Sequence, residues 1–488
     1  MKKSEDNKKS IKKNFFYNLL YEFVIILSPL IVTPYVSRKL GVELIGVRSY
    51  TYAILTYFEL FVNLGIAVYG QREIAKNLFD KKKRSNIFLS LLCLKFFAFL
   101  IVLTIYLVSF VGMGILDKYK IIWLIWIIHL SESLFNVTWY FQGIERFKLI
   151  SIRGIILRTL QIILTLTLIK SPSDFYLYLI IYATIPTLQA ISLWPFLKKE
   201  IDWTELKNVR IKNHLKNVFI FFIPTIATTI YSNVDKIMLG SLLETTTQAG
   251  YYESAQSIAL LATTIFTSIY TVMRSRISAE VAEGNTKDIG YFTQFSLFMV
   301  FAITLGIFSV SGIFITVFYG SDYMAVIPLL RYFCAIIFLV GISGFISAVY
   351  IVPYDKQKYI SIFYVFATLV NIILNAYLIP KLEAFGAIIG SIAAEGVVFI
   401  GCIVLSRKVL NFTKYITYGW KYFISGIFML LVVYPLDMFL NKNIFSLACE
   451  IIIGSVVYLI TLYFLKDSIV RKYIDIKIKD KNNKEVIR

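Results

Sequence analysis

The feature that most constrains this chain is a series of apolar runs, each of about twenty residues, that recur along the whole sequence. A helix of about twenty residues spans the ~30 Å hydrocarbon core of a bilayer. Because lipid offers the backbone no hydrogen-bond partners, a chain built of such runs must be helical there. Ten-residue barrel strands would give a much weaker hydropathy signal. The pattern predicts an all-α polytopic membrane protein.

Composition agrees with this prediction. Hydrophobic residues make up 58% of the 488 positions, charged residues make up 16%, and the mean hydropathy is +0.72. Soluble domains carry roughly a quarter charged residues. A soluble monomer of this composition would expose more apolar surface than such proteins tolerate. The composition therefore favours a multi-pass membrane protein.

The apolar runs predict about fourteen transmembrane helices. Their expected ranges are 15–37, 43–66, 86–112, 119–141, 149–170, 175–197, 218–241, 249–273, 291–317, 327–350, 359–380, 385–406, 415–439 and 443–465. An even number places both termini on one side of the membrane. Of the 50 Lys and Arg residues, 36 then fall in the cytoplasmic segments and 7 in the outer ones. The positive-inside rule predicts this bias for an N-in, C-in topology.

Several functions are excluded at this stage. The net charge of +20 is spread over short segments between apolar runs, which argues against nucleic acid as a partner. The four cysteines lie singly inside apolar runs and form neither a disulfide framework nor a metal-binding spacing. No connection is long enough for a soluble domain, and no Walker-type glycine loop is present. We expect a protein that is not an enzyme and has no bound cofactor. Its activity would draw energy from a H+ or Na+ gradient or from the membrane potential.

Polar side chains recur at helical spacing inside two of the predicted helices. The second helix carries Ser49, Tyr52, Thr56, Glu59 and Asn63. The fourth carries His129, Glu132, Asn136 and Tyr140. Each set lies on one helix face. Since lipid cannot satisfy such groups, the faces must point at each other or at water. We expect a water-filled cavity lined by helices 1, 2, 4, 5, 7 and 8.

Four basic residues are candidates for binding a phosphate group in this cavity: Lys95, Arg158, Arg48 and Arg153. Lys95 and Arg158 lie about nine residues, roughly 13 Å, inside their helices. Arg48 and Arg153 lie near helix ends, where simple anchoring at the membrane interface is the alternative. For Lys95 and Arg158 the alternative is a structural pair with an acidic residue, one of Glu22, Glu59 and Glu132.

A second set of residues is predicted to line the cavity or to couple an ion. It comprises Glu22, Glu59, His129, Glu132, Asp235, Lys236 and Glu395. A local charge pair is the alternative for Asp235 and Lys236, and a packed hydrogen-bonding role is the alternative for His129. Prolines at positions 29, 34 and 224 are expected to bend helices 1 and 7, which would provide hinges.

Several motifs together resemble one family. They are PYVSRKLGVELIGVRSYTYAILTYF (34–58), YGQREIAK (69–76), WYFQGIERFKLISIR (139–153), FFIPTIATTIYSNVDKIMLG (221–240), AGYYESAQSI (249–258) and NAYLIPKLEAFGAIIGSIAAE (375–395). These segments resemble the Wzx-type polysaccharide flippases of the multidrug/oligosaccharidyl-lipid/polysaccharide exporter superfamily. Arg48 and Arg274 depart from the family pattern, which commonly has uncharged residues there. Both add positive charge beside the expected cavity.

The resemblance implies two pseudo-symmetric six-helix bundles, 15–197 and 218–406, joined by a cytoplasmic linker, 198–217. A basic N-terminus, 1–14, two further helices within 407–465 and a charged tail, 466–488, complete the chain. It also implies a flippase that moves polyprenyl-pyrophosphate-linked oligosaccharides to the outer leaflet by alternating access, for capsule or exopolysaccharide synthesis. Expected partners are this lipid-linked oligosaccharide, membrane lipids, and a polysaccharide polymerase with other biosynthetic membrane proteins.

Two other functions stay open. A drug or peptide exporter of the same superfamily would share the fold but would favour an acidic cavity. A flippase for cell-wall or teichoic-acid precursors would differ only in its cargo.

Overall fold

The computed structural model describes residues 20–21, 24–25, 27–283, 289–407 and 412–471. Within these ranges the regular elements are all helices, which confirms the predicted all-α class. The chain divides into two compact units, residues 1–250 and 251–488.

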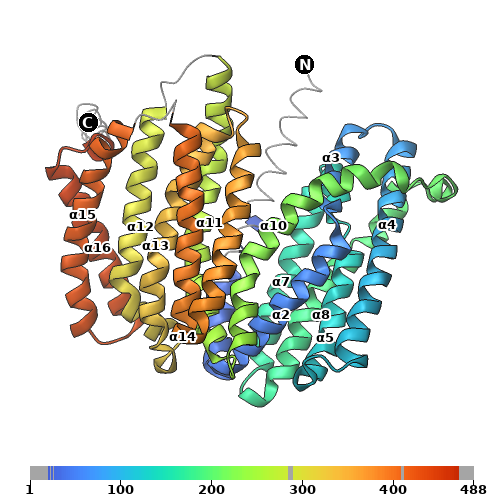
Figure 1. Cartoon of the computed structure of the whole chain (residues 1–488), viewed down its shortest axis with the longest axis horizontal. Helices are drawn as coiled ribbons and strands as arrows, with labels where there is room; N and C mark the ends of the chain where they lie inside the picture. The colour runs from blue at the N-terminus through green and yellow to red at the C-terminus, as the bar shows by residue number, and fades with distance from the viewer. Residues whose placement is uncertain (1–19, 22–23, 26, 284–288, 408–411, 472–488) are drawn as a thin grey trace, which may run out of the picture. The chain divides into compact units, whose positions relative to one another are not determined.

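The first unit contains helical residues 27–40 and nine named α-helices (Figure 1). These are α2 (Val42–Asn63), α3 (Ile66–Lys76), α4 (Lys81–Leu107), α5 (Lys120–Phe135), α6 (Thr138–Gly143), α7 (Phe147–Leu168), α8 (Phe175–Ile191), α9 (Trp194–Glu200) and α10 (Lys212–Leu242). Helix α2 packs against α4, α5 and α10, and α8 packs against α5 and α7. This arrangement places α2 and α5, the two helices with predicted polar faces, side by side.

A break between α2 and α3 lets this part of the chain approach α10 closely. Leu64 and Gly65 both have positive φ, 46° and 75°, and the left-handed region is readily available to glycine. A Cβ atom at position 65 would lie 2.8 Å from backbone atoms of Phe221 and Phe222. Gly65 therefore serves both the turn and the contact with α10.

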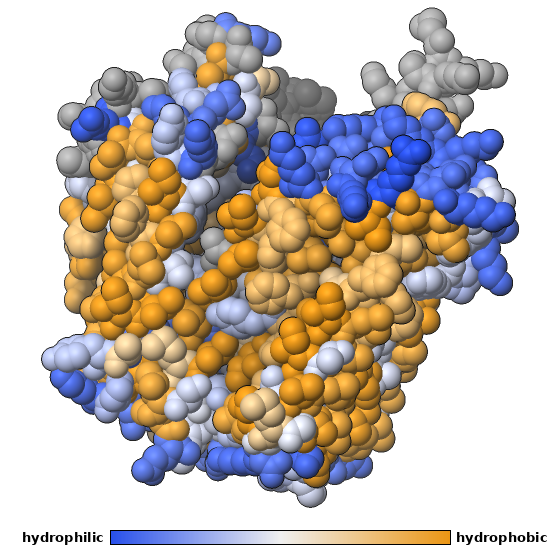
Figure 2. Space-filling model, turned by 45° about the vertical axis from the view of Figure 1, so that its right-hand side comes forward, coloured by the Kyte–Doolittle hydropathy of each residue, from blue (hydrophilic) through white to orange (hydrophobic). Residues whose placement is uncertain are grey.

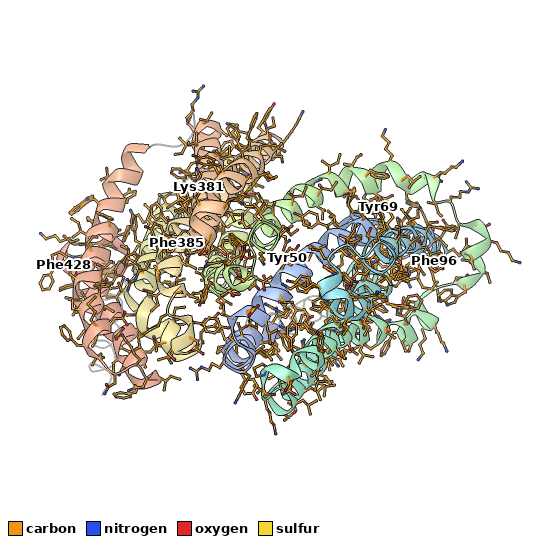
Figure 3. All side chains as sticks on the ribbon, turned by 60° about the horizontal axis from the view of Figure 1, so that its bottom comes forward. Tyr50, Tyr69, Phe96, Lys381, Phe385 and Phe428 are labelled. Carbon is orange, nitrogen blue, oxygen red and sulfur yellow. The ribbon has the colours of Figure 1, made fainter. Side chains whose placement is uncertain are left out.

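The interior of this unit is aromatic, and its outer surface is apolar. Trp123, Trp126 and Tyr106 are fully buried in one core cluster, and Phe88 and Tyr140 are fully buried in another. Hydrophobic side chains cover the flanks of the helices, and hydrophilic ones gather at their ends (Figure 2). Exposed aromatic residues such as Phe96 and Phe428, the latter in the second unit, point away from their helices (Figure 3). Such a surface suits a lipid environment.

The second unit contains six named α-helices: α11 (Thr247–Ala282, which begins just before the unit boundary), α12 (Ile289–Phe318), α13 (Val326–Ile346), α14 (Gln357–Ser406), α15 (Phe412–Phe439) and α16 (Ile444–Phe464). Helix α12 packs against α13, α15 and α16, and α13 packs against α14. Helix α14 is two helices in one, because Glu383 interrupts it with φ 52° and ψ −129°. The interruption falls between the two predicted spans 359–380 and 385–406.

Eleven described helices are long and apolar enough to cross a membrane, or twelve if the two halves of α10 form one bent span. The halves meet at 42°, close to Pro224, which lies inside the helix as expected for a proline bend. The candidate span Lys358–Ser406 has 49 residues. At the α-helical rise it would reach roughly 74 Å, so it contains two crossings rather than one. The total of fourteen and the N-in, C-in orientation stay predictions.

Helix α10 lies in the first unit, where it packs against α2 and α3. The family resemblance implied instead that a second bundle starts at residue 218. That domain division stays a prediction.

Candidate functional site: a buried polar network in the first unit

The predicted polar faces of α2 and α5 meet inside the first unit. The carboxylate of Glu59 lies 2.7 Å from Nδ1 of His129, and the imidazole is buried. One turn further along, the amide of Asn63 donates to the hydroxyl of Ser133 at 3.1 Å. A buried acid–imidazole pair in a membrane protein can hold or pass a proton.

Lys95 on α4 is held by the helix break that follows α5. Asn136 has an extended backbone, with ψ 104°, so its carbonyl leaves the helical hydrogen-bond ladder. The buried Lys95 ammonium donates to this carbonyl at 3.0 Å. The side-chain amide of Asn136 donates to Glu132 at 2.7 Å, which brings this carboxylate within electrostatic range of Lys95. Of the alternatives for Lys95, the structure supplies the acidic neighbour Glu132.

A polar cavity of about 300 Å³ lies beside this network. Its lining comprises Tyr21, Glu132, Asn136, Thr138, Gln142, Phe147, Ile150, Pro186, Gln189 and Ala190. Five helices contribute to it, namely the first helix through Tyr21, α5, α6, α7 and α8, together with the break after α5. Of the ten predicted residues that the structure describes, only Glu132 lines this cavity.

Arg158 lies apart from Lys95. Its Nε donates to the hydroxyl of Ser28 and its Nη1 donates to Oε1 of Gln161, each at 2.7 Å. The bond to Ser28 ties α7 to the first helix, whereas Gln161 lies on α7 itself. Lys95 and Arg158 share no hydrogen-bond partner within the described ranges, so the structure does not unite them in one phosphate-binding pair.

Arg153 lines a second, larger hollow of about 670 Å³ at the start of α7. Three cations line this cationic groove, namely Arg146, Lys148 and Arg153, together with Glu145 and the apolar residues Ile144, Leu149, Ile152, Ile156 and Phe196. The guanidinium of Arg153 donates to the carbonyl of Gln189 and to the hydroxyl of Ser192. Since Gln189 also lines the polar cavity, Arg153 connects the two hollows.

Arg48 extends the network through aromatic rings. Its guanidinium lies 5.4 Å from the ring centroid of Tyr182, within the range of a cation–π contact. The Tyr182 ring in turn stacks on His129, with centroids 6.1 Å apart. Arg48 therefore reaches the Glu59–His129 pair indirectly.

The remaining predicted residues lie elsewhere. Asp235 is buried on α10 in the first unit, beside Lys236, and both have interactions within the structure. Glu395 is buried on α14 in the second unit and also has a partner. Glu22 lies outside the described residues.

The sequence analysis did not predict a charged cluster that forms around Glu200, the last residue of α9. The buried Glu200 binds Arg84 at 2.9 Å and Arg146 at 2.6 Å. Two residues on, outside the candidate spans, Asp202 accepts hydrogen bonds from the side chain and the backbone of Thr204, which lower the pKa of its carboxyl group. Acidic residues stand among the basic residues of the linker in the sequence, and this pattern could have indicated ion pairs there.

The comparisons with known proteins decide the family. Residues 11–278, more than half of the chain, match the family model described as polysaccharide biosynthesis protein. The chain belongs to this family. This result confirms the resemblance found in the sequence motifs. It also agrees with the multi-pass membrane location predicted from the apolar runs.

Relatives and solved structures agree with the assignment. A "Putative O-antigen transporter" of Shigella dysenteriae is 25% identical over 391 residues, which cover 79% of this chain and 97% of the relative. One of the same name from Escherichia coli (strain K12) is 25% identical over 415 residues, or 83% of this chain and 97% of the relative. Both are named as transporters, in agreement with the prediction of a non-enzyme.

The fold is similar to that of two solved transporters. "Lipid II flippase MurJ, inward closed conformation" aligns with a TM-score of 0.72 and 21% identity, over 92% of this chain and all of that one. An outward-facing multidrug resistance MATE family transporter of the MOP superfamily aligns with a TM-score of 0.53 and 16% identity, over 85% of this chain and 97% of that one. At these identities the likeness concerns the fold.

Proposed function

We propose that this protein is a flippase that moves polyprenyl-pyrophosphate-linked oligosaccharide units from the inner to the outer leaflet of the bacterial plasma membrane. The observation that carries the proposal is a buried polar network and cavity inside a unit whose outer surface is apolar. Lipid cannot solvate such groups, so they serve either packing or a polar cargo. The O-antigen transporter name of two full-length relatives supports a sugar cargo.

The cationic groove gives the cargo a place to load. Its three cations suit a pyrophosphate, and its apolar residues Ile152, Ile156 and Phe196 are exposed and suit a prenyl chain. In the proposed topology this end of α7 faces the cytoplasm. Arg153 is thus the best supported of the four phosphate-binding candidates. Lys95, Arg158 and Arg48 follow it as candidates, because none of them lines the cationic groove.

Transport would proceed by alternating access, driven by an ion gradient or by the membrane potential. A potential supplies ~2.3 kcal/mol per charge per 100 mV. The Glu59–His129 pair is the proposed ion-coupling group in the first unit, with Glu132 beside it. Asp235, Lys236, Glu395 and Glu22 are further candidates for this coupling or for lining the path. The unit carried would belong to a surface polysaccharide, either capsule or exopolysaccharide, and a polymerase would take it up on the outer side.

The test is headgroup translocation in proteoliposomes. A fluorescent polyprenyl-pyrophosphate oligosaccharide is placed in the membrane, and a membrane-impermeant quencher reports the headgroups on the outside. We expect wild-type protein to move the headgroup and Arg153→Gln to slow it strongly. Lys82→Gln is the matched control, because Lys82 is an exposed cation of α4 outside the groove. If wild-type protein ignores the lipid but expels an organic cation or a peptide, the drug-exporter function replaces this proposal. Transport of a wall-precursor lipid alone would change the cargo class.

A further inference from the structure

The last two helices of the second unit contain two buried carboxylates that differ sharply in their surroundings. Asp437 lies near the end of α15 and is 4% exposed, and Glu450 lies on α16 and is 0% exposed. Burying an ionised carboxylate among apolar helices is costly unless donors and a counter-charge compensate for it. The partners of each group therefore indicate whether it is ionised.

Asp437 has both a hydrogen-bond donor and a counter-charge, so its surroundings suit an ionised carboxylate. Its Oδ1 accepts from the backbone N–H of Ile313 at 2.6 Å and from the ammonium of Lys442 at 2.8 Å. The approach to α12 depends on Gly312, because a Cβ atom there would lie 3.0 Å from Cγ of Asp437. Lys442 also donates to the main-chain carbonyl of Asp437. The pair is a compact, fully bonded ion pair.

Glu450 has none of these partners. Both oxygens of its side chain are buried, and neither has a hydrogen-bond partner within the part of the chain that the structure describes. Asp437 and Lys442 are both close enough to act on it electrostatically. A buried ionised carboxylate without donors is unstable, so at this position the side chain is the neutral acid.

The other charges around Glu450 do not change this conclusion. Helix α12, which packs against both α15 and α16, contains no charged residue. Arg331 of α13 is the further cation on this side, and it donates to Ser311 at 2.8 Å and lies 4.9 Å from the ring centroid of Tyr434. Two carboxylates therefore share one ammonium, that of Lys442, and only one of them is neutralised by it.

The loop before α16 brings a partly exposed cation close to Glu450 along the chain. Glu450 is the seventh residue of this helix, so it lies roughly 9 Å along the axis from the start. The side chain of Lys442, two residues before the helix, is 30% exposed. Lys442 is thus partly exposed to solvent while it binds Asp437, and it acts electrostatically on Glu450.

We propose that Glu450 is a proton-binding site of this transporter, exchanging its proton with the side of the membrane that carries the loop before α16. Lys442 controls the exchange. While Lys442 is bound to Asp437, Glu450 keeps its proton. When Lys442 turns to Glu450, the proton leaves the carboxyl oxygen for water and the carboxylate remains paired. The proton is then a coupling ion for transport, a role that rests on the proposed function, whereas proton binding itself does not.

Proton binding is tested on the purified full-length chain in nanodiscs by pH-difference infrared spectroscopy. We expect a carboxylic-acid C=O band that vanishes reversibly in alkali and is absent in Glu450→Gln. Gln is close in size and neutral like the acid, so the fold should tolerate it. In Asp437→Asn, Lys442 has only Glu450 to pair with, and the band should be weaker at the same pH. Asp322→Asn, which changes an exposed acid, is the control. A band that survives in Glu450→Gln overturns the proposal.

A second measurement needs no variant. A hydrophobic carbodiimide adds to protonated carboxyl groups in apolar surroundings and rearranges to a stable acylurea. Peptide mapping of the labelled wild-type chain should locate it on Glu450 at neutral pH, with less label in alkali. A wild-type chain labelled elsewhere and not on Glu450 refutes the site.

The coupling role has its own readout. In proteoliposomes, a pH gradient should accelerate wild-type headgroup translocation and should leave Glu450→Gln unaffected. If wild-type protein moves the lipid at the same rate with and without the gradient, the coupling role fails while the flippase proposal stands. If no lipid moves at all, the proposed function fails, and the infrared band still decides whether Glu450 binds a proton.

Discussion

Substituting Lys95 separates a structural role of this residue from a role in transport. Lys95 is 2% exposed, and its ammonium donates to the carbonyl of Asn136 at 3.0 Å and lies within electrostatic range of Glu132. Lys95→Met keeps the length of the side chain but leaves the carbonyl of Asn136 and the carboxylate of Glu132 without their cation. In soluble proteins, removing one member of a buried ion pair lowers the folding stability by about 3–5 kcal/mol, because the other charge is left uncompensated.

The membrane setting lowers this figure, because the unfolded state in a membrane also finds partners for polar groups. We therefore expect a loss of roughly 3 kcal/mol, which is about a hundredfold change in the folding equilibrium. Reversible unfolding in mixed micelles by increasing SDS measures it. Glu132→Gln removes the carboxylate instead, and the double variant removes both charges.

The double variant should be more stable than the sum of the two single losses predicts, by roughly 1 kcal/mol or more. If Lys95 also binds a substrate phosphate, the double variant folds but still fails to move the lipid. If Lys95 is structural, transport returns with stability. Additive losses in the cycle would refute the inferred coupling between Lys95 and Glu132.

Three further predictions concern other charged groups. Glu59→Gln breaks the pair with His129, so gradient-driven transport should fall at least tenfold while protein yield is kept, as a transport assay with and without the gradient would show. Lys148→Gln in the cationic groove should weaken retention of the lipid-linked oligosaccharide severalfold in native mass spectrometry, whereas Lys82→Gln should not. Glu200→Gln leaves the partly buried Arg84 without its carboxylate, so SDS unfolding should show a loss of about 3 kcal/mol and no loss would contradict the pairing.

Much of the fold follows from the sequence because lipid imposes few solutions. Apolar runs of membrane length must be helices, and the sequence predicts two separate spans on either side of Glu383, where the structure has its break. Helical periodicity also identified the faces of α2 and α5 that carry Glu59 and His129. A one-dimensional pattern shows which side of a helix is polar.

The same pattern cannot show which helix lies opposite. Lys95 and Arg158 have similar depth in their helices, yet one binds the carbonyl of Asn136 and the other binds Ser28 and Gln161. The carbonyl of Asn136 can accept from Lys95 only because the helix ends after α5. No residue type at this point in the sequence predicts that the helix ends there. Glu450 and Asp437 lay inside recognisable apolar runs. The rule that singled out Glu395 applies equally to both, so they could have been found from the sequence.

The measurement that tests the central claim most directly is headgroup translocation by the wild-type chain in proteoliposomes. A fluorescent polyprenyl-pyrophosphate oligosaccharide should become accessible to an external quencher faster than in protein-free liposomes. Arg153→Gln should slow this movement, and Lys82→Gln should not. Equal rates with and without protein, together with gradient-driven export of an organic cation, would contradict the flippase account.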